Sequence, residues 1–95
     1  MLRFSTALRQ HKLLSPQYTD LITTGKVNAP FGKYGYGFGD VNFNGVRSFG
    51  HNGGALGISA QLDIYPDLGY TVIVLSNYDP PAMVKVLSKI RTLIV

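Results

Sequence analysis

The sequence predicts an α+β domain in which helices flank an antiparallel β-meander of about four strands. Three observations support this fold class: helix-forming segments at both ends, period-two alternation between them, and tight-turn sequences that separate the alternating segments. The chain has 95 residues, of which 45% are hydrophobic, which suits one small domain with a packed core. We therefore expect residues 1–95 to form a single domain.

The N-terminal quarter of the chain predicts two short helices. The first is amphipathic and would end near residues 10–12. The second would run over residues 16–23, because Ser15 is a good N-cap and Pro16 is favoured in a first helical turn. Gly25 is placed to end this second helix.

The next segments predict a loop and then a hairpin. Residues 26–33 contain asparagine, proline and glycine and predict a loop. Over residues 34–39, three aromatic residues alternate with three glycines, which predicts a strand with one aromatic face. Asn44-Gly45 favours a tight hairpin turn, and the return strand would run from Val46 to about His51.

Two more strands follow. Residues 58–65 alternate between apolar and mostly polar side chains, and residues 66–69 predict a tight turn. Residues 70–76 are almost continuously apolar, which predicts a central strand covered on both faces. A strand at one edge of such a meander could pair with a segment outside the chain or with a second copy.

A C-terminal helix completes the predicted fold. Asp79 would cap it, with Pro80 or Pro81 in its first turn. The net charge of +4 is dispersed, and Lys85 and Lys89 have the spacing of a solvated helix face, so we expect no nucleic-acid partner. The apolar stripe of this helix consists of Met83, Leu87, Ile90 and Ile94.

Composition excludes several kinds of site. The chain has no cysteine, so disulfides and thiolate metal sites are ruled out. Its two histidines, His11 and His51, are far apart and have no carboxylate at ligand spacing, so we expect no metal site and no cofactor. No apolar run approaches the roughly 20 residues that a membrane span requires.

The glycine cluster at residues 49–57 is the candidate functional segment. Glycines at a strand edge let a ligand approach the backbone and leave N–H groups exposed, as in an oxyanion hole. His51 lies within the cluster and could donate a hydrogen bond or move a proton near neutral pH. Taken alone, the cluster is better explained as a glycine-rich hairpin connection with an incidental histidine.

The order of the motifs resembles the C-terminal portion of the serine β-lactamase and penicillin-binding-protein-like superfamily, in particular its class C-like or esterase-like branch. His51-Asn52-Gly53 matches the His-x-Gly form of that family's third motif. The turn at residues 66–69 and the apolar strand closed by Ser76-Asn77 are similar to the segments that follow it. The helices and the aromatic-glycine segment upstream are also similar, so the resemblance covers nearly the whole chain.

The resemblance implies a partial β-lactamase-like fold and specific roles. His51 would line the substrate cleft, where it would contact a substrate carboxylate or the proton-transfer network. His51, Asn52 and Gly53 would bind substrate, and Gly53 would let a substrate backbone pair with the strand edge. The N–H of Gly54 would be one of two oxyanion donors, the other belonging to the nucleophile.

The chain departs from the family at the nucleophile. A Ser-x-x-Lys motif places a lysine three residues after the nucleophilic serine. None of the six serines fits this spacing: Ser5, Ser15, Ser48, Ser59, Ser76 and Ser88. The second motif is also absent, and its closest approach, Tyr18-Thr19-Asp20, falls on a predicted helix. We therefore expect a catalytically silent segment of a hydrolase whose parent performs acyl transfer on a β-lactam, a D-Ala-D-Ala-type peptide or an ester.

Two other classes of function stay open. The glycine-rich edge could accept a peptide by strand addition in a non-catalytic binding module, or a sheet edge could drive self-association into a homo-oligomer. Localisation is not assigned, although the parent family is often periplasmic or secreted. The basic, hydroxyl-containing residues 1–9 have a composition shared by mitochondrial transit peptides, but the resemblance favours an internal helix.

Overall fold

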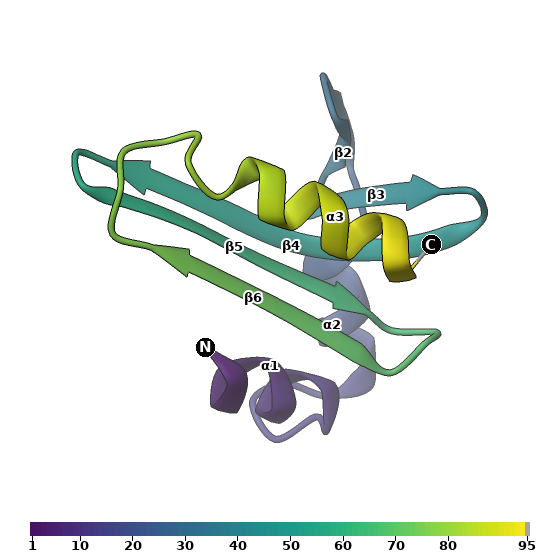
Figure 1. The fold of residues 1–95 in the computed structure, drawn as a ribbon. Helices are drawn as coiled ribbons and strands as arrows, with labels where there is room; N and C mark the ends of the chain where they lie inside the picture. Colours follow the sequence, from purple (N-terminus) through teal and green to yellow (C-terminus); the bar gives the residue numbers. More distant parts are fainter. Residues whose placement is uncertain (95) are drawn as a thin grey trace.

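The computed structural model describes residues 1–94 and has an α+β fold. Its sheet contains six antiparallel strands in the order β1-β2-β3-β4-β5-β6. Helix α3 packs across one face of this sheet, while α1 and α2 lie on the other side (Figure 1). The predicted fold class is confirmed, but the expected strand number of about four is wrong. The elements are α1 Leu2–Arg9, α2 Pro16–Thr23, β1 Val27–Ala29, β2 Gly32–Tyr34, β3 Gly39–Phe43, β4 Val46–Ala55, β5 Ile58–Tyr65, β6 Tyr70–Ser76 and α3 Val84–Ile94.

The N-terminal helices follow the sequence prediction closely. Helix α1 ends at Arg9, just before the predicted limit, and α2 has the predicted bounds. The side chain of Ser15 accepts a hydrogen bond from the N–H of Tyr18 at 3.3 Å, which is the expected N-cap contact. Thr24, with an extended backbone, follows the last helical residue of α2, so the helix ends at Thr23, two residues before Gly25.

The segment predicted as a loop instead forms a short hairpin. Strands β1 and β2 pair with Val27 opposite Tyr34 and Ala29 opposite Gly32, and residues 30–31 form the turn. Pro30 lies outside the ladder, so its missing N–H does not interrupt the pairing. Strands of three residues are too short to produce a readable alternation, which is why the sequence indicated a loop.

The predicted aromatic strand over residues 34–39 is also wrong. Strand β2 ends at Tyr34, and the chain reverses before β3 begins at Gly39. The N–H of Gly35 donates to the carbonyl of Phe38 at 2.7 Å, and Gly37 has φ +86°. The alternation of aromatics and glycines therefore spans a hairpin turn, where a glycine supplies the left-handed conformation.

The hairpin between β3 and β4 forms where it was predicted. Asn44 and Gly45 have φ of 52° and 83°, the positive values that a tight turn of this type needs. Strand β4 then continues to Ala55, beyond the predicted end near His51, and the chain turns at residues 56–57. The glycine cluster is therefore part of a strand instead of the connection after it.

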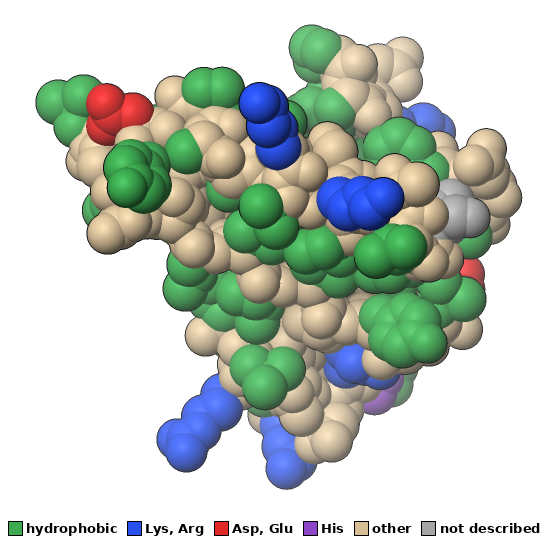
Figure 2. Space-filling model, viewed as in Figure 1, with side chains coloured by type: hydrophobic (Ala, Val, Ile, Leu, Met, Phe, Trp, Pro, Cys, Tyr) green, Lys and Arg blue, Asp and Glu red, His purple; other side chains and the backbone are tan. Residues whose placement is uncertain are grey.

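Strand β6 lies at the edge of the sheet, not at its centre as predicted. It pairs with β5, from Ser59 opposite Ser76 to Tyr65 opposite Tyr70. Its apolar run has a different cause: side chains on both faces contact a hydrophobic core, because helices cover both sides of the sheet. Figure 2 shows further apolar side chains at the surface on the α3 side, and the exposed residues of β6 and α3 include Tyr70, Leu75, Val84, Val86 and Leu93.

The C-terminal helix starts later than predicted. Helix α3 begins at Val84, and residues 80–83 form turns. Asp79 does not cap the helix, because its carboxylate accepts a hydrogen bond from the N–H of Gly57 in the β4–β5 turn. The predicted apolar stripe does face the sheet, with Leu87 buried and Ile90 and Ile94 packed against the same cluster.

Two hydrophobic clusters lie on opposite faces of the sheet. One joins α1 to the sheet through Leu8, Phe38, Phe49, Leu62 and Ile64, with Ile22 and Ile73 packed against it. The other lies beneath α3 and contains Tyr65, Val72, Met83 and Leu87. Strand β5 contributes to both clusters and contains five consecutive buried residues, 61–65.

Candidate functional site

The candidate site lies where β4 extends past β3. Strand β3 begins at Gly39, which pairs with Gly50, so the residues after Gly50 have no β3 partner. On the other side, β4 stays paired with β5 as far as Ala55 opposite Ile58. All four predicted site residues, His51, Asn52, Gly53 and Gly54, lie on this extension and are exposed. The structure thus places them together on one half-paired strand.

The free edge of this extension carries main-chain donors. The Gly35–Phe38 contact defines a hydrogen-bonded pair, and such pairs alternate with non-hydrogen-bonded pairs along an antiparallel ladder. Applying this alternation to the β2–β3 register and then to the β3–β4 register shows which residues of β4 bond to β3. The N–H groups of Val46, Ser48 and Gly50 point toward β3. We infer that Asn52 and Gly54 direct theirs the same way, beyond the end of β3. The N–H of Gly53 points toward β5.

The spacing of these donors limits what they can bind. Alternate residues of a strand lie roughly 6.6 Å apart, whereas oxyanion donors must each lie about 3 Å from a single oxygen. Asn52 and Gly54 therefore cannot share one oxyanion. They match two successive carbonyl groups of an extended ligand, and an oxyanion at Gly54 would need its second donor from another segment.

His51 is held by two contacts at this edge. Its Nδ1 atom lies against the carbonyl oxygen of Asn52, and its Nε2 atom lies 2.9 Å from the hydroxyl of Tyr34. A carbonyl oxygen can only accept, so this contact requires a proton on Nδ1, and in the neutral tautomer that carries it Nε2 accepts the hydroxyl proton of Tyr34. The two rings also pack edge to face at 5.9 Å between centroids. Tyr34 thus orients the imidazole.

The glycines around the motif differ in what surrounds them. A Cβ atom on Gly50 would lie 1.8 Å from the carbonyl oxygen of Leu62, so no side chain fits there. On Gly54 it would lie 2.6 Å from Cγ of Pro80, which covers this residue from the α3 side. A Cβ on Gly53 would meet nothing within 4 Å. Gly53 therefore leaves bare strand surface beside His51.

The serines nearest the motif do not face His51. Ser48 and His51 are three residues apart on one strand, so their side chains point to opposite faces. Ser48 and Ser59 are both buried in the fold. The strand serines around the motif thus do not supply the nucleophile that the sequence also lacks.

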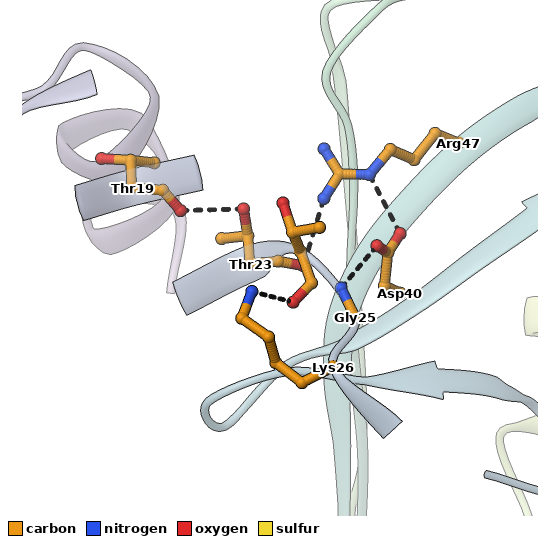
Figure 3. A network of polar contacts seen from close by, with 7 residues as sticks. Thr19, Thr23, Gly25, Lys26, Asp40 and Arg47 are labelled. Atoms are coloured by element: carbon orange, nitrogen blue, oxygen red, sulfur yellow. Dashed lines mark hydrogen bonds and ion pairs between the residues drawn. The ribbon is translucent and has the colours of Figure 1, made fainter. Parts of the chain in front are cut away.

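A polar latch positions the start of the sheet against α2 (Figure 3). Asp40 accepts hydrogen bonds from the N–H of Gly25 at 2.8 Å and from Nε of Arg47 at 2.9 Å. Arg47 also donates through Nη2 to the carbonyl of Thr23 at 3.1 Å. These contacts link the C-terminal end of α2 to the β3–β4 hairpin. Asp40 follows Gly39, the first residue of β3, so the contacts hold the end of β3 beside which the free edge of β4 begins.

A second polar cluster lies beneath α3. Arg91 donates to both carboxylate oxygens of Asp63, at 2.7 and 2.9 Å, and Gln61 donates to Oδ1 at 2.8 Å. Hydrogen bonding to Asp63 raises the pKa of Arg91, so this guanidinium stays charged. No local motif indicates this pair, because its members are 28 residues apart in the sequence. Tyr34, at 17 residues from His51, was missed for the same reason.

Two kinds of site find no support among the described residues. Within residues 1–94, no three histidine, aspartate or other ligating side chains gather as a metal site would require. No helix of this part of the chain has the length and hydropathy needed to cross a bilayer.

Comparisons with known proteins add no assignment. No protein-family model, curated protein or solved structure matches the chain. The resemblance to serine β-lactamases therefore depends on the sequence motifs alone.

Proposed function

We propose that the chain supplies the substrate-accepting strand of a serine-hydrolase acyl-transfer site, as the C-terminal segment of a β-lactamase-related domain. The observation that carries the proposal is the half-paired extension of β4, where the N–H groups of Asn52 and Gly54 face away from β5 beside His51. An extended peptide or acyl-amide ligand would add to this edge as a further strand.

The roles in this proposal follow from the geometry. Asn52 and Gly54 would each donate to a ligand carbonyl, and the bare surface of Gly53 would admit the ligand chain. His51, held by Tyr34, would accept or donate a proton at Nε2 once the ligand displaces the tyrosine hydroxyl. The nucleophile must come from a segment outside this chain, so the chain alone should bind substrate without turning it over.

NMR titration of the ¹⁵N-labelled chain with diacetyl-Lys-D-Ala-D-Ala tests the proposal. We expect saturable shifts of the Asn52 and Gly54 amides with a Kd of roughly tens of millimolar, since two main-chain hydrogen bonds contribute roughly 1 kcal/mol each. Asn52→Pro removes one edge donor and should abolish binding. Asn52→Ala is the matched control, because it loses the same side chain but keeps the main-chain N–H, and it should still bind. An absence of saturable shifts, or shifts confined to β6, would reject the proposal.

A second candidate function is self-association through β6. Among residues 1–94 this edge strand pairs with β5 alone, and Tyr70 and Leu75 expose apolar side chains on it. Unpaired apolar edges favour pairing with another chain. Size-exclusion chromatography with light scattering over a range of concentrations tests this candidate, and a monomer at all concentrations would eliminate it.

A further inference from the structure

A cavity of about 260 Å³ lies on the α3 face of the sheet, next to the candidate site but on the opposite side from Gly53. Its apolar walls come from the β1–β2 hairpin and β3, through Phe31, Val41 and Phe43. Ser48 and the Asp63–Arg91 pair form its polar side. The volume is near the lower end of the range for small-molecule sites, which indicates a compact ligand.

The polar side of this cavity offers donors and few acceptors. The Asp63 carboxylate already accepts three hydrogen bonds, two from Arg91 and one from Gln61. A guanidinium has five N–H groups, and Arg91 uses two of them on Asp63. The side chain of Arg91 is 35% exposed, so its remaining donors are accessible. Asp63 thus has little acceptor capacity left, whereas Arg91 keeps N–H groups that a ligand can use.

A buried tyrosine hydroxyl lies beside the same groups. Tyr65 is fully buried, and its hydroxyl has no hydrogen-bond partner among the described residues. Ser48 and Arg91, which line the cavity, lie within hydrogen-bond reach of this hydroxyl, whereas Tyr65 itself does not line the cavity. Small rotations of these two side chains would pair the hydroxyl without a ligand. Tyr65 therefore lies behind the polar wall of the cavity and is not itself a ligand contact.

We propose that this cavity binds a small monocarboxylate with an aromatic or branched apolar body. The carboxylate would accept from the free N–H groups of Arg91 and from the hydroxyl of Ser48, both of which line the cavity. A planar carboxylate suits the guanidinium fork better than a single acceptor does. The body of the ligand would contact Phe31 and Phe43. Nothing in this inference requires the β4 edge to accept a substrate.

Titration of the ¹⁵N-labelled chain with sodium 3-phenylpropionate tests the inference. We expect saturable shifts at the Arg91 side-chain Nε–H and at the Ser48 amide, with a Kd in the millimolar range for about 11 non-hydrogen atoms. The neutral probe 3-phenyl-1-propanol should bind about tenfold more weakly, because it lacks the charge-assisted contact. Asn52 also lines the cavity, so its amide does not discriminate between the two sites. A shift of the Gly54 amide, which lies outside the cavity lining, is not expected, and this separates the test from that of the proposed function.

Two variants and one matched control make the test specific. Ser48→Ala removes a hydroxyl that lines the cavity and is a small change within a strand, so it should fold normally and bind the acid several-fold more weakly. Arg91→Lys keeps the charge and loses the fork, and should weaken binding about tenfold. Tyr70→Phe changes an exposed tyrosine of the same sheet and should leave binding unchanged.

Three outcomes would overturn the inference. The first is the absence of any saturable shift around the cavity. The second is equal binding of the acid and the alcohol, which would show an apolar pocket without carboxylate recognition. The third is unchanged affinity in Ser48→Ala. Because that variant is expected to remain folded, the test stays decisive even if Arg91→Lys unfolds.

Discussion

A pair of adjacent proline substitutions tests which main-chain N–H groups of β4 point toward its free edge at the candidate site. In the inferred pairing, the N–H of Asn52 faces the free edge of β4 and the N–H of Gly53 donates toward Ala60 on β5. Asn52→Pro therefore removes a donor without a strand partner, whereas Gly53→Pro removes a ladder hydrogen bond and places its ring against β5. Both prolines strain φ similarly, so the difference between them isolates the hydrogen-bond direction.

The expected difference is large relative to the total stability. Gly53→Pro should lower the free energy of unfolding by about 3 kcal/mol or more, as proline does where a backbone bond is lost. Asn52→Pro should change it by less than about 1 kcal/mol. A domain of this size has a total of roughly 5–14 kcal/mol, so the Gly53 variant loses a substantial part of its stability.

Urea denaturation followed by far-ultraviolet circular dichroism measures both values, with Gly53→Ala as a control for loss of the glycine itself. A Cβ at position 53 meets nothing within 4 Å, so the alanine variant should remain close to the parent chain. Equal destabilisation by the two prolines, or a greater effect of Asn52→Pro, would refute the inferred directions of the Asn52 and Gly53 N–H groups. The proposed edge donors would then be assigned to the wrong residues.

Four further predictions concern the two polar clusters. Tyr65→Phe should raise the free energy of unfolding by about 1 kcal/mol, because it removes a buried hydroxyl without a partner; thermal melts measure this. Burial, and secondarily the charge of Asp63, raises the pKa of Tyr65. The stability that the protonated Tyr65 contributes is therefore complete below the ordinary value of 10.0 and is lost as pH rises above it. Urea midpoints at several alkaline pH values should fall more steeply in the parent chain than in Tyr65→Phe. Asp63→Ala should lower the free energy of unfolding by about 3 kcal/mol, because Arg91 loses its buried partner. Asp40→Ala should lower it by about 1–2 kcal/mol, because the contact with Arg47 is lost. Urea denaturation measures both values.

The outcomes that contradict these predictions are distinct. A destabilised Tyr65→Phe would show that the hydroxyl has a partner, such as ordered water. Parallel alkaline profiles for the two chains would exclude Tyr65 as the titrating group. An Asp63→Ala variant no less stable than Asp40→Ala would remove the reason to regard the Asp63–Arg91 pair as the more buried interaction.

Local sequence signals predicted the elements whose cause is local. Asn44-Gly45 requires two positive φ values in succession, and Ser15-Pro16 caps and starts a helix, so both features could be predicted from neighbouring residues. The hairpin of β1 and β2 could not, because three-residue strands show no clear period. The edge position of β6 was missed because an apolar strand indicates burial of its two faces, not the number of its strand partners.

The candidate site was predicted in part. The sequence identified His51 and the adjacent glycines, and the structure places them on one exposed strand. The sequence could not indicate that β3 begins opposite Gly50 and so leaves the later residues of β4 without a partner on that side. Register depends on pairing between distant segments. Tyr34 and Arg91 come from other elements and carry no local motif, so their contacts with His51 and Asp63 emerge only from the fold.

The latch between α2 and the sheet has a consequence for how the molecule opens. Helices α1 and α2 reach the sheet mainly through Leu8, Ile22 and the contact of Arg47 with the carbonyl of Thr23. Strands β4 and β5 share a longer ladder, and β5 is buried on both faces. Amide protons in the two helices should therefore exchange with solvent through a local opening that leaves β4 and β5 intact, and the N-terminal helices would form a separate, less stable cooperative unit.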